Sequence, residues 1–277
     1  MDQQEALRRR PPNNPVVDPI ADAAEADDGD VGHQDDLDAL LPAETVRPLA
    51  YDVHLALAGP PLLATEGTVD ITLAVGRPTS SIRLHAAGLC LFSAAIARVS
   101  GVFEPATVCF VSPQVVAVDV ASPLLVGQHV LRLSFAGGIG QRSQGIYACL
   151  WSPSSHNNNC DEEHKDEDAG SRIGGVEKAS SRQGWILATH FEPTHCRRAF
   201  PCFDLAHFKA QVHLTLLVAG QDPKRNVLSN TKVELSGDAA EFSPELLGEN
   251  GAAFVGQLLR RAAEQKQMQE QRQQQEQ

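Results

Sequence analysis

Residues 184–204 have the sequence GWILATHFEPTHCRRAFPCFD, and this stretch decides how the rest of the chain is interpreted. A strand-like run at 185–188 leads into it. Pro193 and Pro201 then exclude one long regular strand, because each proline fixes φ and lacks a backbone donor. Aromatic residues and cysteines are nevertheless dense among the charges. We therefore expect a loop that is anchored in protein rather than surrounded by solvent.

Short stretches of alternating apolar and polar residues lie on both sides of this loop. Alternation predicts strands at 51–57, 69–75, 82–85 and 212–218, and β-rich runs separated by Ser-Pro and Gly signals predict strands at 108–111, 116–120 and 130–135. Residues 89–99 are also predicted as a strand, although the sequence at 94–97 leaves a helix open. Many short strands separated by turn residues, without long amphipathic helices, predict an all-β sandwich or saddle.

Other segments depart from the β pattern. Residues 1–38 are rich in Pro, Asp and Ala, which predicts a disordered acidic leader. The β-domain is predicted over 39–236, with a flexible acidic insertion at 152–183. Residues 237–277 are predicted to be a helical, Gln-rich, low-complexity tail, in which a short amphipathic helix begins at Ser243.

Charge and composition argue against several classes of protein. The formal net charge of -12 disfavours nucleic-acid binding, and no window approaches the ~20 apolar residues of a membrane span. No signal peptide is visible, and the cysteines form no CxxC pair, which suggests reduced thiols. We therefore expect a cytoplasmic protein without a membrane or nucleic-acid partner. A Cys196–Cys202 disulfide would be expected only after export.

Two candidate centres for catalysis carry weak signals. His156, Cys160 and His164 are spaced four apart, but in a segment without helical signals, so a polar loop is favoured over a metal site. No HExxH sequence is present, so no metalloprotease centre is recognisable. Cys196 and Cys202 have basic neighbours that could lower a thiol pKa, yet two inert buried thiols are the favoured interpretation.

Glu192 is the third candidate. Because it precedes a proline, it is expected in an extended or turn conformation rather than in a helix. Its carboxylate could receive a ligand's ammonium group through charge-assisted hydrogen bonds. The alternative is an ion pair with Arg197 or Arg198, and on physical grounds alone this alternative is favoured.

Several segments together resemble one known family. They are LPAETVRPLAYDVHLAL (41–57), EGTVDITLAV (66–75), PTSSIRLHAAGL (78–89), GIYACLW (145–151), ATHFEPTHCRRAFPCFDLAHFKAQVHLTLLV (188–218) and VLSNTKV (227–233). In this order they resemble the N-terminal β-domain of the gluzincin zinc aminopeptidases, of the puromycin-sensitive and aminopeptidase N type. The resemblance covers residues 40 to 235, and the FEPT–RRAFPCFD run is its most specific part.

The resemblance implies a saddle-shaped antiparallel β-sandwich that packs on a thermolysin-like zinc domain. In the family, the loop that matches 189–194 has the pattern Thr-Gln-Phe-Glu-Pro-Thr and reaches into the active site. Its glutamate binds the substrate's free α-amino group, a role that falls on Glu192. The glutamine, which lines the first specificity pocket, is replaced by His190, and the family's Asp-Glu-Pro becomes Asp204-Leu205-Ala206.

Three motifs of the family are absent from this sequence: Gly-Ala-Met-Glu-Asn, HExxH and the downstream glutamate ligand. The resemblance therefore implies a substrate-amine-binding domain without catalytic or metal-binding residues of its own, inactive alone, from a family whose cofactor is zinc. Its expected partners are a peptide N-terminus, if a catalytic domain is joined, and a protein at the surface such a domain would cover. The alternative is a non-catalytic scaffold module, like the peptidase-like transcription-initiation subunit.

Overall fold

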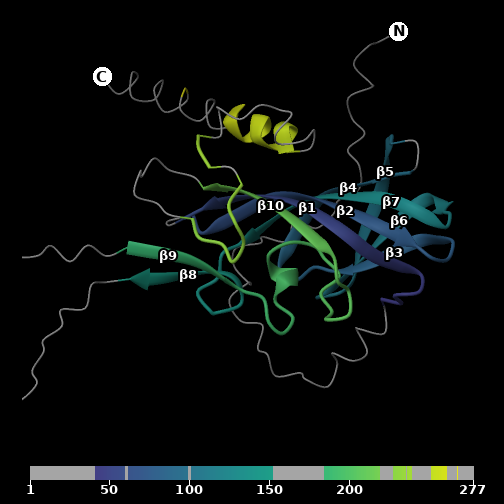
Figure 1. Ribbon diagram of the computed structural model, residues 1–277, viewed down its shortest axis with the longest axis horizontal. Helices are drawn as coiled ribbons and strands as arrows, with labels where there is room; N and C mark the ends of the chain where they lie inside the picture. Colours follow the sequence, from purple (N-terminus) through teal and green to yellow (C-terminus); the bar gives the residue numbers. More distant parts are fainter. Residues whose placement is uncertain are drawn as a thin grey trace, which may run out of the picture.

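The computed structural model describes residues 41–59, 62–98, 101–151, 184–218, 227–234, 236–238, 251–260 and 267. Strands dominate these residues (Figure 1). The elements are β1 (Val46–Ala58), β2 (Ala64–Val75), β3 (Thr79–His85), β4 (Leu89–Ala97), β5 (Phe103–Ser112), β6 (Val115–Leu124), β7 (Gly127–Gly138), β8 (Gly145–Trp151), β9 (Gly184–His190), the 3-10 helix η2 (Cys196–Arg198) and β10 (Gln211–Val218). One α-helix follows at 251–260. The predicted all-β fold with a short helix near the C-terminus is confirmed.

The main sheet has eight strands in the order β10-β1-β2-β7-β4-β5-β6-β3, and β8 and β9 form a separate two-stranded sheet. The sheet is antiparallel, as predicted, except at one edge, where β10 runs parallel to β1. A parallel pair needs a long connection, and here almost the whole domain lies between the two strands. The sheet is therefore mixed.

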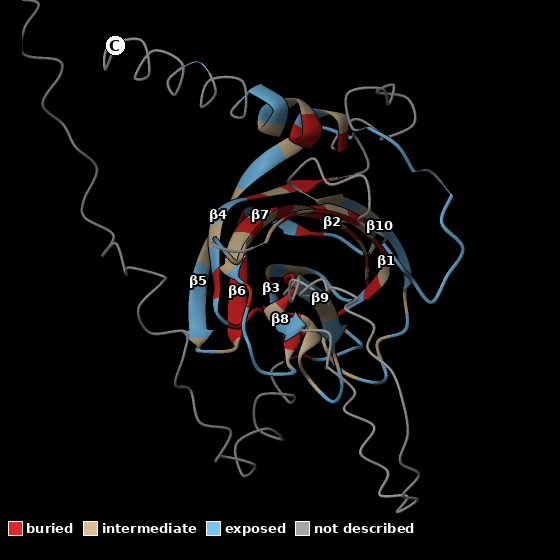
Figure 2. Cartoon of the chain, turned by 90° about the vertical axis from the view of Figure 1, so that its left-hand side faces the viewer, coloured by how far each residue is buried: buried red, intermediate tan, exposed pale blue. Residues whose placement is uncertain are grey.

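β5 turns the sheet through a corner. Its first part, 103–106, pairs with β4, whereas 107–112 pairs with β6. A strand that changes partners in this way lets a sheet fold back on itself. Figure 2 shows the result, in which β3 lies inside the arch formed by β1, β2 and β7. The two ends of the curled sheet therefore face each other, as in the predicted sandwich.

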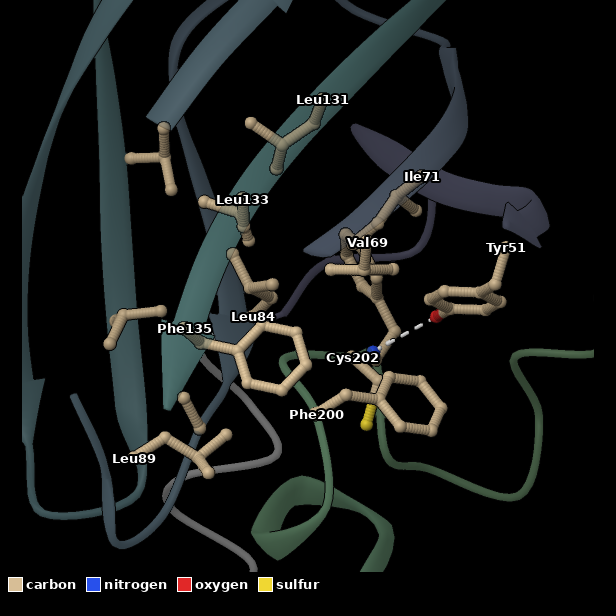
Figure 3. Packing of buried hydrophobic residues seen from close by; sticks show 14 of the residues in the cluster. Tyr51, Val69, Ile71, Leu84, Leu89, Leu131, Leu133, Phe135, Phe200 and Cys202 are labelled. Carbon is tan, nitrogen blue, oxygen red and sulfur yellow. Dashed lines mark hydrogen bonds between the residues drawn. The ribbon is translucent and has the colours of Figure 1, made fainter. Parts of the chain in front are cut away.

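The core fills the inside of this arch. β2 alternates between buried and half-buried residues along its full length, as expected when one face of a strand packs inward. Ile71, Leu133 and Phe135 are completely buried and belong to the same cluster as Phe200 and Cys202. Figure 3 shows the Phe135 ring beside Phe200. Gly67 makes room for this packing, because a Cβ there would lie 2.7 Å from the Phe135 ring.

β10 continues the inner face of the sheet but is not covered. Its residues Val212, Leu214 and Leu216 are in register with buried residues of β1, yet all three are exposed. We call these three side chains the β10 apolar row. The core therefore ends at β1, and an apolar strip remains at the edge of the sheet.

The α-helix at 251–260 packs on the opposite face of β1. Phe254 and Val255 are buried, and the Phe254 ring centroid lies 6.4 Å from that of the buried His54. A Cβ at Gly251 would lie 2.5 Å from His54 Cε1, so the absence of a side chain permits this close approach. The predicted start at Ser243 lies outside the described residues. Among the residues described, no helix has the length and apolarity needed to cross a membrane.

Candidate functional site

The candidate site is the turn that follows β9. The strand ends at His190, and the Phe191 carbonyl accepts a hydrogen bond from the His195 amide at 2.8 Å, which closes the turn. The Glu192–Pro193 peptide bond in this turn is cis. Since Pro193 has no amide donor, the strand cannot continue through it. The chain passes directly into η2.

The β8–β9 pair holds the start of this turn. Gly145 pairs with His190, and the two strands remain in register to their other end. Gly145 has φ of +64°, and a Cβ there would lie 2.8 Å from Arg198 Cβ. Glycine is suited to this position both by its left-handed backbone and by its lack of a side chain. It allows β8 to lie directly against η2.

The buried Arg197 side chain holds the turn against the interior of the domain. Only 1% of this side chain is exposed. Its Nε donates to Asp204 Oδ2 at 3.0 Å, and its two terminal nitrogens donate to Gln114 Oε1 at 2.8 Å and to the Asp204 carbonyl at 3.1 Å. The Arg197 amide donates to the same Asp204 carboxylate at 3.1 Å. A buried cation requires such compensation, so η2 is fixed to the interior.

His85 and Tyr51 connect the following residues to the sheet. His85 and Cys202 exchange backbone hydrogen bonds of 2.8 and 3.0 Å, and His85 Nδ1 accepts from the Asp204 amide at 3.1 Å. The Tyr51 hydroxyl accepts from the Phe203 amide at 3.0 Å (Figure 3). Both side chains thus form part of the support beneath the turn.

Burial dominates the ionisation of these groups. It lowers the pKa of His85 to about 3, with a smaller contribution from the Arg197 cation, so the imidazole is neutral near pH 7. Burial also raises the pKa of Tyr51 and of Cys202 above their usual values. The support is therefore a set of neutral hydrogen-bonding groups around one ion pair.

Glu192 lies at the surface of this supported turn. Its side chain is exposed and makes no ion pair or hydrogen bond with the residues that the structure describes. The ion pair with Arg197 or Arg198, favoured on physical grounds alone, is not formed. Arg197 is committed to Asp204 in the interior instead.

His190 is exposed and directed toward the segment before β8. Its Nδ1 lies 2.9 Å from the Ser143 carbonyl, which can only accept, so Nδ1 carries the hydrogen. In the neutral ring Nε2 is then an acceptor. The His190 and His195 rings are 6.5 Å apart. Both predicted substrate-binding residues, Glu192 and His190, thus lie at one turn.

No zinc-type centre is apparent in the described part of the chain. His156, Cys160 and His164 lie outside the described residues. One cluster of possible ligands occurs among those described, formed by Cys196, Cys202 and Asp204, whose ligand atoms lie within 4.8 Å of one another. The Asp204 carboxylate is already bound by a guanidinium group. A catalytic zinc site does not fit these residues.

Sequence reasoning missed most of the supporting residues. Gln114, His85 and Tyr51 are separated from their partners in the turn by 83, 119 and 152 positions, respectively. No local pattern marks such distant contacts. Arg197 was noted as a charge of the loop, but its sequence context does not distinguish it from the half-buried Arg198.

Comparisons with known proteins identify the family of the chain. Residues 47–243 match the model of the peptidase M1 N-terminal domain. Aminopeptidase M1-B of Oryza sativa subsp. japonica is 28% identical over 176 residues, which are 63% of this chain and 17% of the rice protein. Endoplasmic reticulum aminopeptidase 1 of Mus musculus is 27% identical over 205 residues, 72% of this chain and 19% of the mouse protein.

Among solved structures, an M1 zinc metallopeptidase from Deinococcus radiodurans is 20% identical with a TM-score of 0.43. The match covers 64% of this chain and 34% of the bacterial one. The chain thus spans less than a fifth of the length of the rice and mouse relatives.

Proposed function

The chain belongs to the peptidase M1 N-terminal domain family, and we propose from this premise that it provides the amine-binding part of an aminopeptidase site. Peptidases of the M1 family are zinc enzymes. In the proposed role, Glu192 accepts hydrogen bonds from the α-ammonium group of a peptide N-terminus. His190 lies beside it and contacts the first side chain of the peptide.

The observation that carries this proposal is the state of Glu192. Its carboxylate is exposed and unpaired among the described residues, although two arginines follow it closely in sequence. The backbone that carries it is fixed by the buried Arg197–Asp204 pair. An available acid on a rigid support suits the recognition of an ammonium group, because little ordering is required on binding.

One exposed carboxylate does not make a strong site. An exposed ion pair contributes about 0.2–1 kcal/mol, whereas a charged hydrogen bond protected from water contributes about 1.5–3 kcal/mol. Useful affinity therefore requires a second surface that covers the amine. A joined zinc domain would supply that surface as well as the metal and its activated water.

We expect the chain alone to be inactive as a peptidase, since its sequence contains no HExxH motif and its described residues do not fit a catalytic zinc. The purified chain, with added zinc, should not hydrolyse fluorogenic aminoacyl amides above a Glu192→Ala control. Turnover that depends on Glu192 would contradict this expectation.

Amine binding can be tested separately by NMR of the full isotope-labelled chain. Because an exposed ion pair of about 0.2–1 kcal/mol gives a dissociation constant of only about 0.2–0.7 M, the peptide is added at about 0.1 M. At this concentration a dipeptide with a free amine should shift the backbone signals of residues 190–195 in fast exchange, and its N-acetylated form should not. Glu192→Gln should remove the difference. Glu44→Gln is the matched control, because Glu44 is 75% exposed and its carboxylate pairs with Arg77 rather than with a residue of the turn. Equal shifts with both peptides, or an unchanged response of Glu192→Gln, would refute the proposal.

The second candidate function is a non-catalytic interaction module. The β10 apolar row favours it, because three exposed apolar side chains on an edge strand are suited to a protein partner. Affinity purification from a nuclear extract distinguishes the two functions. Recovery of general transcription factors, together with no amine response at Glu192, would establish the scaffold role.

We propose a cytosolic location for the aminopeptidase role, which imaging of the tagged chain would test.

A further inference from the structure

Two thiols lie together where the site turn joins the core. Cys196 begins η2, and Cys202 forms the backbone bridge with His85. Their Sγ atoms lie within 4.8 Å of each other, and both cysteines are free thiols. We propose that Cys196 and Cys202 are a redox-active pair, which a small-molecule disulfide such as oxidised glutathione converts to an intramolecular disulfide.

The backbone holds the two sulfurs close before any reaction. The Cys196 carbonyl accepts from the Ala199 amide at 2.9 Å, and the Cys202 amide donates to His85 at 3.0 Å. The buried Arg197–Asp204 pair fixes the segment between them. A disulfide bond of about 2 Å therefore requires only a short approach of the side chains. Preorganisation of this kind raises the effective concentration of the second thiol.

The two thiols differ in access. Cys196 is half-buried, and it is the more accessible residue of the pair. Cys202 is only 4% exposed, and burial raises the pKa of its thiol. The first attack therefore belongs to Cys196, because the thiolate is the nucleophile. Cys202 reacts only in the second step, with the Cys196 sulfur of the mixed disulfide.

The reaction balances with the named oxidant. The Cys196 thiolate attacks one sulfur of oxidised glutathione, forms a mixed disulfide and releases one glutathione thiolate. The Cys202 sulfur then attacks the Cys196 sulfur and expels the second glutathione, which takes the Cys202 proton. The net reaction converts two protein thiols and one glutathione disulfide into one protein disulfide and two glutathione thiols.

Asp204 is the third member of the cluster with Cys196 and Cys202, and it disfavours a metal site there. Asp204 Oδ2 accepts from both the side chain and the amide of Arg197. A divalent cation would have to enter beside this buried guanidinium group and to deprotonate a thiol whose burial opposes charge. The geometry thus favours sulfur–sulfur chemistry over metal binding.

The product is identifiable because of where trypsin cuts. Cleavage after Arg182, Arg197, Arg198 and Lys209 separates the two cysteines into the peptides 183–197 and 199–209. The native full chain is treated with oxidised glutathione, remaining thiols are alkylated, and the digest is analysed by mass spectrometry. We expect these two peptides as a disulfide-linked product that dithiothreitol separates.

Three variants test which cysteine reacts first with glutathione and which one completes the disulfide. Cys149→Ser, an exposed thiol on β8, is the matched control and should give the linked peptides like the wild type. Cys196→Ser should give none. Cys202→Ala should retain glutathione on Cys196 as a stable mixed disulfide. Should this buried substitution prevent folding, shown by circular dichroism, the comparison of the native wild-type chain with the urea-unfolded chain still decides.

The ratio of linked product to mixed disulfide should be at least about tenfold higher for the native chain than for the urea-unfolded chain. The proposal is overturned if the native chain keeps glutathione on Cys196 without linkage, or if the ratio is the same in urea. It is also overturned if linkage to Cys90, Cys109 or Cys149 is equally abundant. Stoichiometric protection of Cys196 and Cys202 from alkylation by Zn²⁺ would assign a metal site instead. This inference does not depend on the amine-binding role of Glu192.

Discussion

Replacement of Arg197 by methionine should be among the most destabilising single changes in the domain. The side chain of Arg197 is 1% exposed and that of Asp204 is 11% exposed, so the variant leaves a carboxylate in the interior without its cation. Loss of one partner of a buried ion pair costs about 3–5 kcal/mol. The Gln114 amide also loses its 2.8 Å hydrogen bond. We therefore expect the free energy of unfolding to fall by about 4 kcal/mol.

Urea denaturation followed by circular dichroism is the suitable assay. Both tryptophans, Trp151 and Trp185, are about half exposed at 50% and 44%, so their fluorescence would report poorly on core unfolding. With a typical slope of about 2 kcal/mol per M, the transition midpoint should fall by about 2 M. Arg198→Met is the control, because this neighbouring arginine makes no ion pair among the described residues; its midpoint should change little.

A second substitution separates the effect of losing the ion pair from the effect of changing the packing around it. In Arg197→Met, adding Asp204→Asn removes the stranded charge but keeps an oxygen that can accept from the backbone amide. The double variant should therefore recover about 1–3 kcal/mol relative to Arg197→Met alone. The reasoning would be refuted if Arg197→Met lost no more stability than Arg198→Met, or if Asp204→Asn brought no recovery.

Three further changes test other parts of the support. His85 has a pKa of about 3 when folded against about 6.5 unfolded, so the folded state loses stability as pH falls below about 6.5, by up to ~1.4 kcal/mol per pH unit until about pH 3. His85→Asn should flatten this acid slope in urea titrations between pH 7 and 4; an unchanged slope would exclude His85 as its origin. Tyr51→Phe leaves the Phe203 amide without its buried acceptor and should cost about 1–3 kcal/mol by the same assay, whereas a neutral result would show that water replaces the hydroxyl. Gly145→Ala introduces a Cβ at φ of +64° and 2.8 Å from Arg198 Cβ, and should cost at least about 1 kcal/mol; a stabilised variant would show that β8 does not press on η2.

The strands were predictable because their signal is local. Alternation over a few residues marks which face of a strand is buried, and β2 and β7 follow it along their lengths. The parallel pairing of β10 with β1 and the partner change within β5 were not predictable in this way. Both depend on which strands meet after the chain has returned from a distant position, and alternation does not contain that information.

The site was predictable only in part. The resemblance in the FEPT–RRAFPCFD run directed attention to Glu192 and His190, and the turn that it implied is present. Local physics favoured the wrong partner for Arg197, because an arginine close in sequence to an acid is a plausible ion pair on a surface. The domain boundaries at 39 and 236 and the acidic insertion remain predictions.

Glu192 and Asp204 lie in different environments, and this difference explains why the expected ion pair between Glu192 and Arg197 does not form. Arg197 is buried, and its charge had to be compensated in the interior, where Asp204 and Gln114 offer fixed acceptors. Glu192 is exposed, so water compensates its charge at little cost and no arginine is needed. The same reasoning limits what Glu192 can do alone: in water an amine gains about 0.2–1 kcal/mol from it, and in a covered site several times more. In the proposed role, specificity for an amine would therefore depend on the turn together with the surface that covers it.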